Sequence, residues 1–206
     1  KDVGQSKVAA IRELTDTQIQ TYVESARAFV SSNQPTYFGI GIEVNRIYES
    51  SPSDYEKFVG LFNSASDAIH SASPSTKVFT SFQLERLKGL RGGLYGGVND
   101  TSSDDWSLLQ DFGKADLIAF TTYPSIIYKQ PGNIPQGYYS DVQNHTDKPV
   151  AFSEMGWPSG AVASGWDSTL ENQAKFIVQF SDLTSTLKPQ FTIWSFLYDP
   201  NTAVPF

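Results

Sequence analysis

The chain has 206 residues and a formal net charge of −7, with many aromatic residues and no cysteine. This length predicts one large domain or two small ones. The acidic balance, without clusters of Lys and Arg, argues against a nucleic-acid surface. The missing cysteines exclude disulfides, zinc–thiolate centres and thiol nucleophiles. No apolar run approaches the roughly 20 residues of a membrane span.

Helical and strand patterns alternate along the chain. A helix over residues 16–32 is predicted by apolar side chains three and four positions apart, with Thr15 and Gln18 as a capping box. A strand over 37–45 ("YFGIGIEVN") follows, then a helix over 54–72 that Ser53 and Glu56 introduce, and a strand over 77–83. The later elements are predicted as helices over 104–112, 137–143 and 169–187, and strands over 116–124, 149–154 and 191–199.

Five helix–strand units at this spacing are typical of β/α repeats with a parallel sheet. Right-handed crossovers lead either to an open doubly wound sheet or to a barrel. No GxGxxG motif follows a strand, and we interpret the glycine-rich "RGGLYGG" (residues 91–97) as a loop. Polar and aromatic residues gather where each strand ends, which is where barrels carry their functional groups. We therefore predict an α/β fold, a TIM (β/α)8 barrel truncated to about five C-terminal β/α units, as one partial domain over residues 1–206.

A sheet of only five strands leaves two unpaired edges, and unpaired edges tend to pair with other chains. We expect three upstream β/α units and the last helix to lie outside this sequence. The alternative is a complete small protein whose edges are paired by a partner chain.

Two glutamates stand out at strand ends. Because side chains alternate along a strand, Gly39, Gly41 and Glu43 share one face, and the small glycines fit a crowded barrel interior. Glu43 is then expected at the mouth of the barrel, with Asn45 beside it. In "VAFSEMGWPSG" (residues 150–160), Val150, Phe152 and Glu154 share a parity, so Glu154 ends its strand as Glu43 does.

Two carboxyl groups facing each other suit the cleavage of a glycosidic bond. One, protonated, donates to the leaving oxygen, and the other, ionised, attacks the anomeric carbon or activates water. A single Glu at a strand end is more often solvated or salt-bridged, so the pair carries the hypothesis. Glu85 and Asp199 are rivals, but Glu85 lies beyond its predicted strand and Asp199 at the very end of its own, where a loop is expected.

"GIEVN" and "SEMGWPSG" resemble the acid/base and nucleophile motifs of clan A glycoside hydrolases, which are retaining enzymes on (β/α)8 barrels. The second is particularly similar to the segment of β-1,3-glucanases, and related wording occurs in β-1,4-galactanases. By length the resemblance spans nearly the whole chain, as strands four to eight. It implies Glu43 as general acid/base and Glu154 as nucleophile.

The same resemblance implies that the Tyr123 hydroxyl orients Glu154 and that Trp194 forms a sugar platform. An indole face stacks well on the apolar face of a pyranose. Trp157 is expected to shape the cleft, and Asn45 and Gln83 are expected to bind sugar hydroxyls from their positions alone. One position departs from the clan, because Ile42 stands where an Asn usually precedes the acid/base.

The sequence thus predicts retaining hydrolysis of β-glycosidic bonds in an oligo- or polysaccharide, without a cofactor or a bound metal. The alternative, suggested by Ile42 and the incomplete barrel, is a catalytically impaired carbohydrate-binding barrel. Two glycosylation sequons, at Asn99 and Asn144, favour an extracellular, secreted protein.

Overall fold

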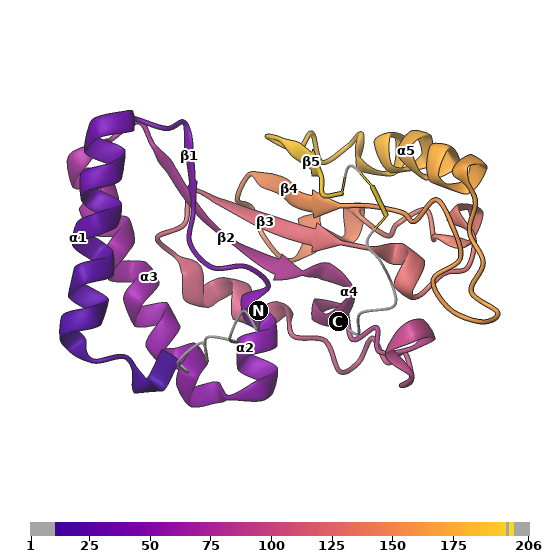
Figure 1. The fold of residues 1–206 in the computed structure, drawn as a ribbon, viewed down its shortest axis with the longest axis horizontal. Helices are drawn as coiled ribbons and strands as arrows, with labels where there is room; N and C mark the ends of the chain where they lie inside the picture. Colours follow the sequence, from indigo (N-terminus) through magenta and orange to yellow (C-terminus); the bar gives the residue numbers. More distant parts are fainter. Residues whose placement is uncertain (1–10, 197, 200–206) are drawn as a thin grey trace, which may run out of the picture.

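Five parallel strands form one sheet whose order follows the chain, β1-β2-β3-β4-β5 (Figure 1). The computed structural model describes residues 11–196, 198 and 199. The strands are β1 (Tyr37–Gly39), β2 (Lys77–Gln83), β3 (Leu117–Thr122), β4 (Val150–Met155) and β5 (Thr192–Trp194). The two edge strands are the shortest, so each presents little unpaired backbone.

Helices connect the strands and cover one face of the sheet. In Figure 1, α1 and α3 pack side by side near β1 and β2, and α5 lies beside β4 and β5. The α-helices are α1 (Asp16–Asn33), α2 (Val44–Ser50), α3 (Pro52–Ala72), α4 (Leu84–Leu87) and α5 (Leu170–Thr184). The 3-10 turns are η1 (Ile11–Glu13), η2 (Gly93–Tyr95), η3 (Trp106–Phe112), η4 (Pro124–Ile126), η5 (Pro131–Asn133) and η6 (Ser140–Asn144).

The predicted strand over 37–45 is wrong in its second half. Regular pairing ends at Gly39, and a helix that the sequence did not predict, α2, begins at Val44. Gly41 adopts a φ of 79°, and a Cβ there would lie 2.4 Å from the Phe58 ring. Only glycine fits this left-handed turn against Phe58, and the turn breaks the strand before Glu43.

The other boundary corrections are smaller. Helix α3 begins two residues early, with Ser51 rather than Ser53 as its cap. Thr169, not Ser168, caps α5. The helices predicted over 104–112 and 137–143 are the 3-10 segments η3 and η6. The glycine-rich segment 91–97 is a loop with a single 3-10 turn, as predicted.

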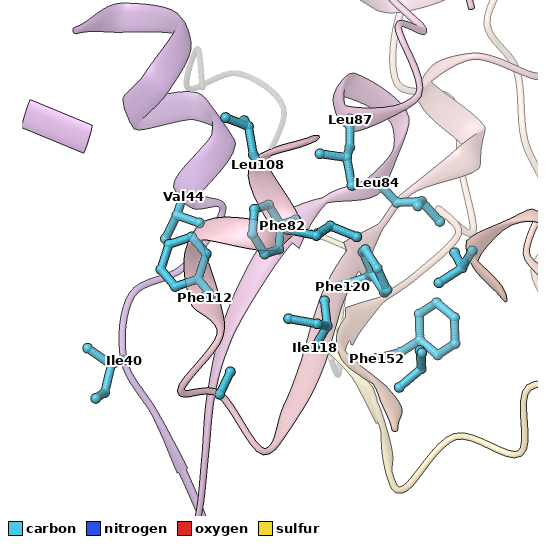
Figure 2. Close-up of a cluster of buried hydrophobic side chains, with 14 of the residues drawn as sticks. Ile40, Val44, Phe82, Leu84, Leu87, Leu108, Phe112, Ile118, Phe120 and Phe152 are labelled. Carbon is cyan, nitrogen blue, oxygen red and sulfur yellow. The ribbon is translucent and has the colours of Figure 1, made fainter. Parts of the chain in front are cut away.

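The larger apolar cluster lies between the sheet and its helices. Figure 2 shows Val44, Phe82 and Phe112 gathered on this side, with Phe120 and Phe152 on neighbouring strands. Phe112 contacts Phe62 and Phe82 edge-on, with ring centroids 5.0 and 5.5 Å apart. Edge-to-face contacts of this kind stabilise a core beyond the area they bury.

A second, smaller cluster lies on the opposite face of the sheet. Leu117 and Ala119 of β3 and Ala151 of β4 are fully buried there, against Tyr37, Phe79 and Phe191. The Tyr37 and Phe191 rings lie 4.9 Å apart, although Tyr37 belongs to β1 and Phe191 directly precedes β5. Residues from the two ends of the sheet therefore touch, and the sheet curls into a half-barrel around them. The predicted fold class is confirmed.

Two absences apply to the described part of the chain. None of its helices has the length and apolar character to cross a bilayer. No three His, Asp or Glu side chains within residues 11–196 and 198–199 gather as a metal site would require.

Thr80 offers a test of this packing. Its side chain in β2 is fully buried, and its hydroxyl has no hydrogen-bond partner among the described residues. Thr80→Val removes that hydroxyl at constant shape, so we expect the free energy of unfolding to rise by about 1 kcal/mol in urea denaturation. Thr184→Val is the matched control, because the Thr184 hydroxyl donates to the Phe180 carbonyl and its loss should destabilise the protein. Equal effects of the two substitutions would contradict the packing described.

Candidate functional site

Glu43 lies in the turn between β1 and α2, with a left-handed backbone at φ 51°. Its backbone N–H donates to the Ser81 hydroxyl of β2 at 3.2 Å, which ties the turn to the neighbouring strand. A left-handed conformation costs a non-glycine residue about 1 kcal/mol or more. Glu43 thus occupies a strained position that is held by its surroundings.

The Glu43 carboxylate contacts two elements. Its Oε1 accepts a hydrogen bond from the Thr121 hydroxyl of β3 at 2.8 Å, and its Oε2 pairs with Arg46 at 2.9 Å. The Glu43 side chain is only 18% exposed, whereas that of Arg46 is 59% exposed. The carboxylate therefore turns toward the concave face, and its cation partner lies on the solvent side.

Glu154 reaches the same face because β4 contains a bulge. Phe152 pairs with Phe120, and the next pair joins Glu154 to Thr121, so Ser153 is an extra residue. Phe152 packs on the helix side, against Phe180. The parity argument that placed Val150, Phe152 and Glu154 on one face is therefore wrong, and the bulge turns Glu154 the opposite way.

Thr121 is the residue that brings the two glutamates together. Its hydroxyl donates to Glu43, and its backbone lies beside that of Glu154 in the β3–β4 ladder. Neighbouring strands are separated by about 4.8 Å. The two carboxylates thus lie on one concave face, at the C-terminal ends of the strands, on either side of Thr121.

Tyr123 directly follows β3 and contacts Glu154. Its phenol donates to Glu154 Oε2 at 2.7 Å. Burial raises the pKa of Tyr123 well above its ordinary value, and the charges of Glu154 and Glu43 act in the same direction, whereas a hydrogen bond with Ser195 opposes them. The phenol is therefore protonated, and able to donate, throughout the physiological pH range.

The side-chain amides of Asn45 and Gln83 form hydrogen bonds within the protein. Asn45 is fully buried, and its side chain donates to the Gln83 carbonyl and accepts from the Gln83 N–H. The Gln83 side chain accepts from the Arg86 N–H and donates to Glu85. Sugar binding by either amide stays a prediction, and because both residues are buried it would require the surrounding turn to move.

The two tryptophans pack with α5. Trp157 is buried, its indole N–H donates to the Ser168 hydroxyl, and its ring lies 5.2 Å from that of Phe176. Trp194 is partly buried against the larger apolar cluster, and its ring centroid lies 6.4 Å from that of Phe176. Both rings thus contact the same side chain of α5, and their predicted roles at the cleft stay predictions.

Two residues near the site were not predicted. Phe196 is 43% exposed, and its ring centroid lies 6.1 Å from that of Tyr123. Glu85, set aside as a loop residue, is fully buried and linked by hydrogen bonds to the end of β3. Glu85 was named only as a rival, and Phe196 was not named, because both lie just beyond their strands, where alternation no longer predicts direction.

The strain at Glu43 can be measured with a pair of substitutions. Glu43→Ala and Glu43→Gly both remove the carboxylate, but only glycine relieves the left-handed backbone. We expect the glycine variant to be more stable by about 1 kcal/mol in chemical denaturation. At Glu24, an exposed position within α1, the order should reverse, because glycine costs a helix interior about 1 kcal/mol relative to alanine. The same order at both positions would rule out the strained turn.

No family model matches the sequence, and no curated protein sequence matches it. Solved structures do match its fold. The GH53 catalytic domain of Ignisphaera aggregans superposes with a TM-score of 0.59 at 15% identity, over 93% of this chain and 57% of its own. A Bacteroides uniformis β-glucuronidase has a TM-score of 0.62 at 14% identity, over 91% and 22% of the two chains. An endo-1,4-β-D-mannanase of Thermotoga petrophila has a TM-score of 0.50 at 18% identity, over 85% and 54%.

The chain thus spans little more than half, or less, of each of these similar proteins. At such identities the likeness establishes the fold alone. The curled five-strand sheet corresponds to part of a TIM-barrel architecture of the kind found in glycoside hydrolases.

Proposed function

We propose that this chain is the C-terminal part of a glycoside hydrolase barrel that cleaves β-glycosidic bonds of an oligo- or polysaccharide with retention of configuration. The observation that carries the proposal is the placement of Glu43 and Glu154 on one concave face, joined through Thr121. Their position at the C-terminal ends of parallel strands is where barrel enzymes carry their chemistry. The likeness of the fold to a GH53 domain and to a mannanase supports it.

In the first step, protonated Glu43 gives its proton to the glycosidic oxygen while the bond from that oxygen to the anomeric carbon breaks. The Glu154 carboxylate attacks the anomeric carbon and forms a glycosyl-enzyme ester. In the second step, Glu43, now ionised, takes a proton from water as the water oxygen attacks the same carbon. Glu154 departs as a carboxylate, and the sugar keeps its configuration.

The hydrogen bond from Tyr123 makes the two carboxyl oxygens of Glu154 inequivalent. The phenol donates to Oε2, which leaves Oε1 as the atom that attacks carbon. A fixed donor also prevents the carboxylate from rotating away from the sugar. Orientation of this kind contributes to catalysis because the reacting atoms start close to their bonding geometry.

Arg46 sets a condition on this mechanism. It pairs with Glu43 Oε2, yet Glu43 must carry a proton when it protonates the leaving group. The largely exposed Arg46 side chain is free to swing toward solvent when a glycan enters. Substrate binding would thereby separate the ion pair and prepare Glu43 for proton transfer.

The second candidate function is carbohydrate binding without turnover. The Arg46–Glu43 ion pair favours it, because a permanently paired carboxylate is a poor proton donor. Ile42, which is 67% exposed beside Glu43, also favours it, since it offers a sugar no hydrogen bond where the clan usually has Asn. Both candidate functions include the same further proposals. These are a carbohydrate ligand, a barrel completed by further strands or by a partner chain, and an extracellular location.

The test uses the intact protein and aryl β-glycosides with a good leaving group, across a panel of sugars. Glu154→Gly should lower kcat by about 10³-fold or more, and azide should restore turnover as an α-glycosyl azide, because the small anion fills the place of the lost carboxylate. Glu43→Ala should spare the first step for these substrates and give a β-glycosyl azide. The two opposite configurations would distinguish the nucleophile from the acid/base.

Glu24→Ala, which removes an exposed carboxylate on α1, is the matched control and should leave kcat unchanged. Near wild-type turnover by Glu154→Gly or Glu43→Ala on a natural glycan would refute the assignment. Glycan binding by calorimetry, with no release of reducing ends by the wild type, would favour the binding function instead.

A further inference from the structure

Glu85 is a buried carboxyl group that the proposed reaction does not use. It lies in α4, just beyond β2, with no exposed surface. Its Oε1 accepts hydrogen bonds from the Thr122 hydroxyl at 2.7 Å, the Tyr123 N–H at 3.2 Å and the Tyr138 hydroxyl at 2.9 Å. Its Oε2 accepts from the Gln83 amide at 2.6 Å. All four donors are neutral groups.

A carboxyl group in this position is costly to bury. No ion pair among the described residues includes Glu85, since Arg86 pairs with Glu49 and Lys88 with Asp141. Burial raises its pKa, and its hydrogen bonds oppose that effect. The described titratable groups on which the Glu85 charge acts are phenols: Tyr95, Tyr128, Tyr138 and Tyr139. Well-packed apolar side chains in place of a buried charged group often stabilise a protein equally well. A contribution to stability therefore does not by itself explain why a carboxyl group lies here.

The hydrogen bonds of Glu85 lead to the candidate site. Glu85 Oε1 holds the side chain of Thr122, the last residue of β3, and the backbone of Tyr123, the residue after it. Tyr123 has left the regular strand geometry, with φ −135° and ψ 70°. The ladder no longer fixes its direction, yet its phenol must reach Glu154 Oε2.

We propose that Glu85 is a positioning residue, whose carboxylate fixes the backbone at Thr122 and Tyr123 so that the Tyr123 phenol holds Glu154 in its attacking orientation. This inference rests on the proposed function and adds a residue to it. Glu85 touches no reacting atom and acts only through Tyr123. Its effect should therefore disappear when the Tyr123 phenol is removed.

A double-mutant cycle in the intact protein tests this coupling. Glu85→Gln places an amide against the Gln83 amide, so the two cannot both keep their hydrogen bonds. We expect kcat to fall roughly tenfold to a hundredfold with KM within about twofold of wild type, because the loss is one of orientation. In a Tyr123→Phe background the same substitution should change kcat by less than about twofold. An unchanged kcat in Glu85→Gln, or an equal loss in both backgrounds, would overturn the proposal.

A swapped pair supplies the rescue. In Gln83→Glu/Glu85→Gln, the new carboxylate accepts from the Arg86 N–H and the new amide, while that amide's oxygen still accepts from Thr122, Tyr123 and Tyr138. At saturating glycan, kcat should return to within about threefold of wild type, whatever the effect of the change at position 83 on KM. A folded swapped variant without activity would contradict positioning by hydrogen bonds, and this arm suffices even if Glu85→Gln alone does not fold.

Asp116→Asn is the matched control. Asp116 Oδ2 accepts the backbone N–H of Val78, so it is also a carboxylate that holds a sheet amide, but at the opposite end of the strands. This substitution should lower stability and leave kcat unchanged. An equal fall in kcat would show that any such loss slows the enzyme, and would count against Glu85.

Hydrogen exchange separates this inference from the proposed function. The Tyr123 amide, followed by NMR, should exchange at least tenfold faster in Glu85→Gln and recover in the swapped pair, whether or not the protein turns over a glycan. A wild type without turnover would refute the proposed function but leave this result standing. Unchanged exchange at Tyr123 would refute the role of Glu85 itself.

Discussion

The pairing of Thr121 with Glu154 across β3 and β4 is the constraint on which the site depends. Alternation gives Thr121 the concave face, where its hydroxyl reaches Glu43. The bulge at Ser153 then gives Glu154 that same face, although its sequence parity matches the helix-facing Phe152. A one-residue change in register would turn the carboxylate into the apolar layer under α5. Two glutamates 111 positions apart in the sequence share this face because one threonine bonds to Glu43 and pairs in the ladder with Glu154.

The sequence predicts the layers of the fold well and the details of the strand ends poorly. Long apolar stripes and capping residues predict α1, α3 and α5 to within two or three residues. The sequence predicts β3 and β4 as well, because each of these central strands begins with a run of apolar residues. The turn at Gly41 depends instead on the Phe58 ring of a later helix, and the bulge at Ser153 depends on pairing with β3. Neither contact is visible in a local pattern.

For the candidate residues, too, local patterns are informative and contacts between distant segments are not visible in the sequence. The structure links Glu43 and Glu154 to the same residue, Thr121, and joins Tyr123 to Glu154 by the hydrogen bond that the resemblance implied. The catalytic roles of these residues stay predictions, and the direction of Glu154 was derived from a parity that the bulge reverses. Sequence patterns do not show that the Asn45 amide bonds to the Gln83 backbone, or that the Gln83 amide bonds to Arg86 and Glu85. Nor do they show that Glu85 is buried, since its surroundings include Tyr138, which lies just before η6 and donates to it. A left-handed Glu43 and an unpaired buried Glu85 both oppose stability, and such residues cluster where structure serves function.

The most direct test of the paired glutamates is the distance between the carboxyl oxygens of Glu43 and Glu154 in a crystal structure of the intact protein. We expect about 5 to 5.5 Å, the separation at which a carboxylate attacks the sugar itself. A separation of about 6.5 to 9.5 Å would admit a water and indicate inversion, and a still larger one would contradict the pairing of the two glutamates.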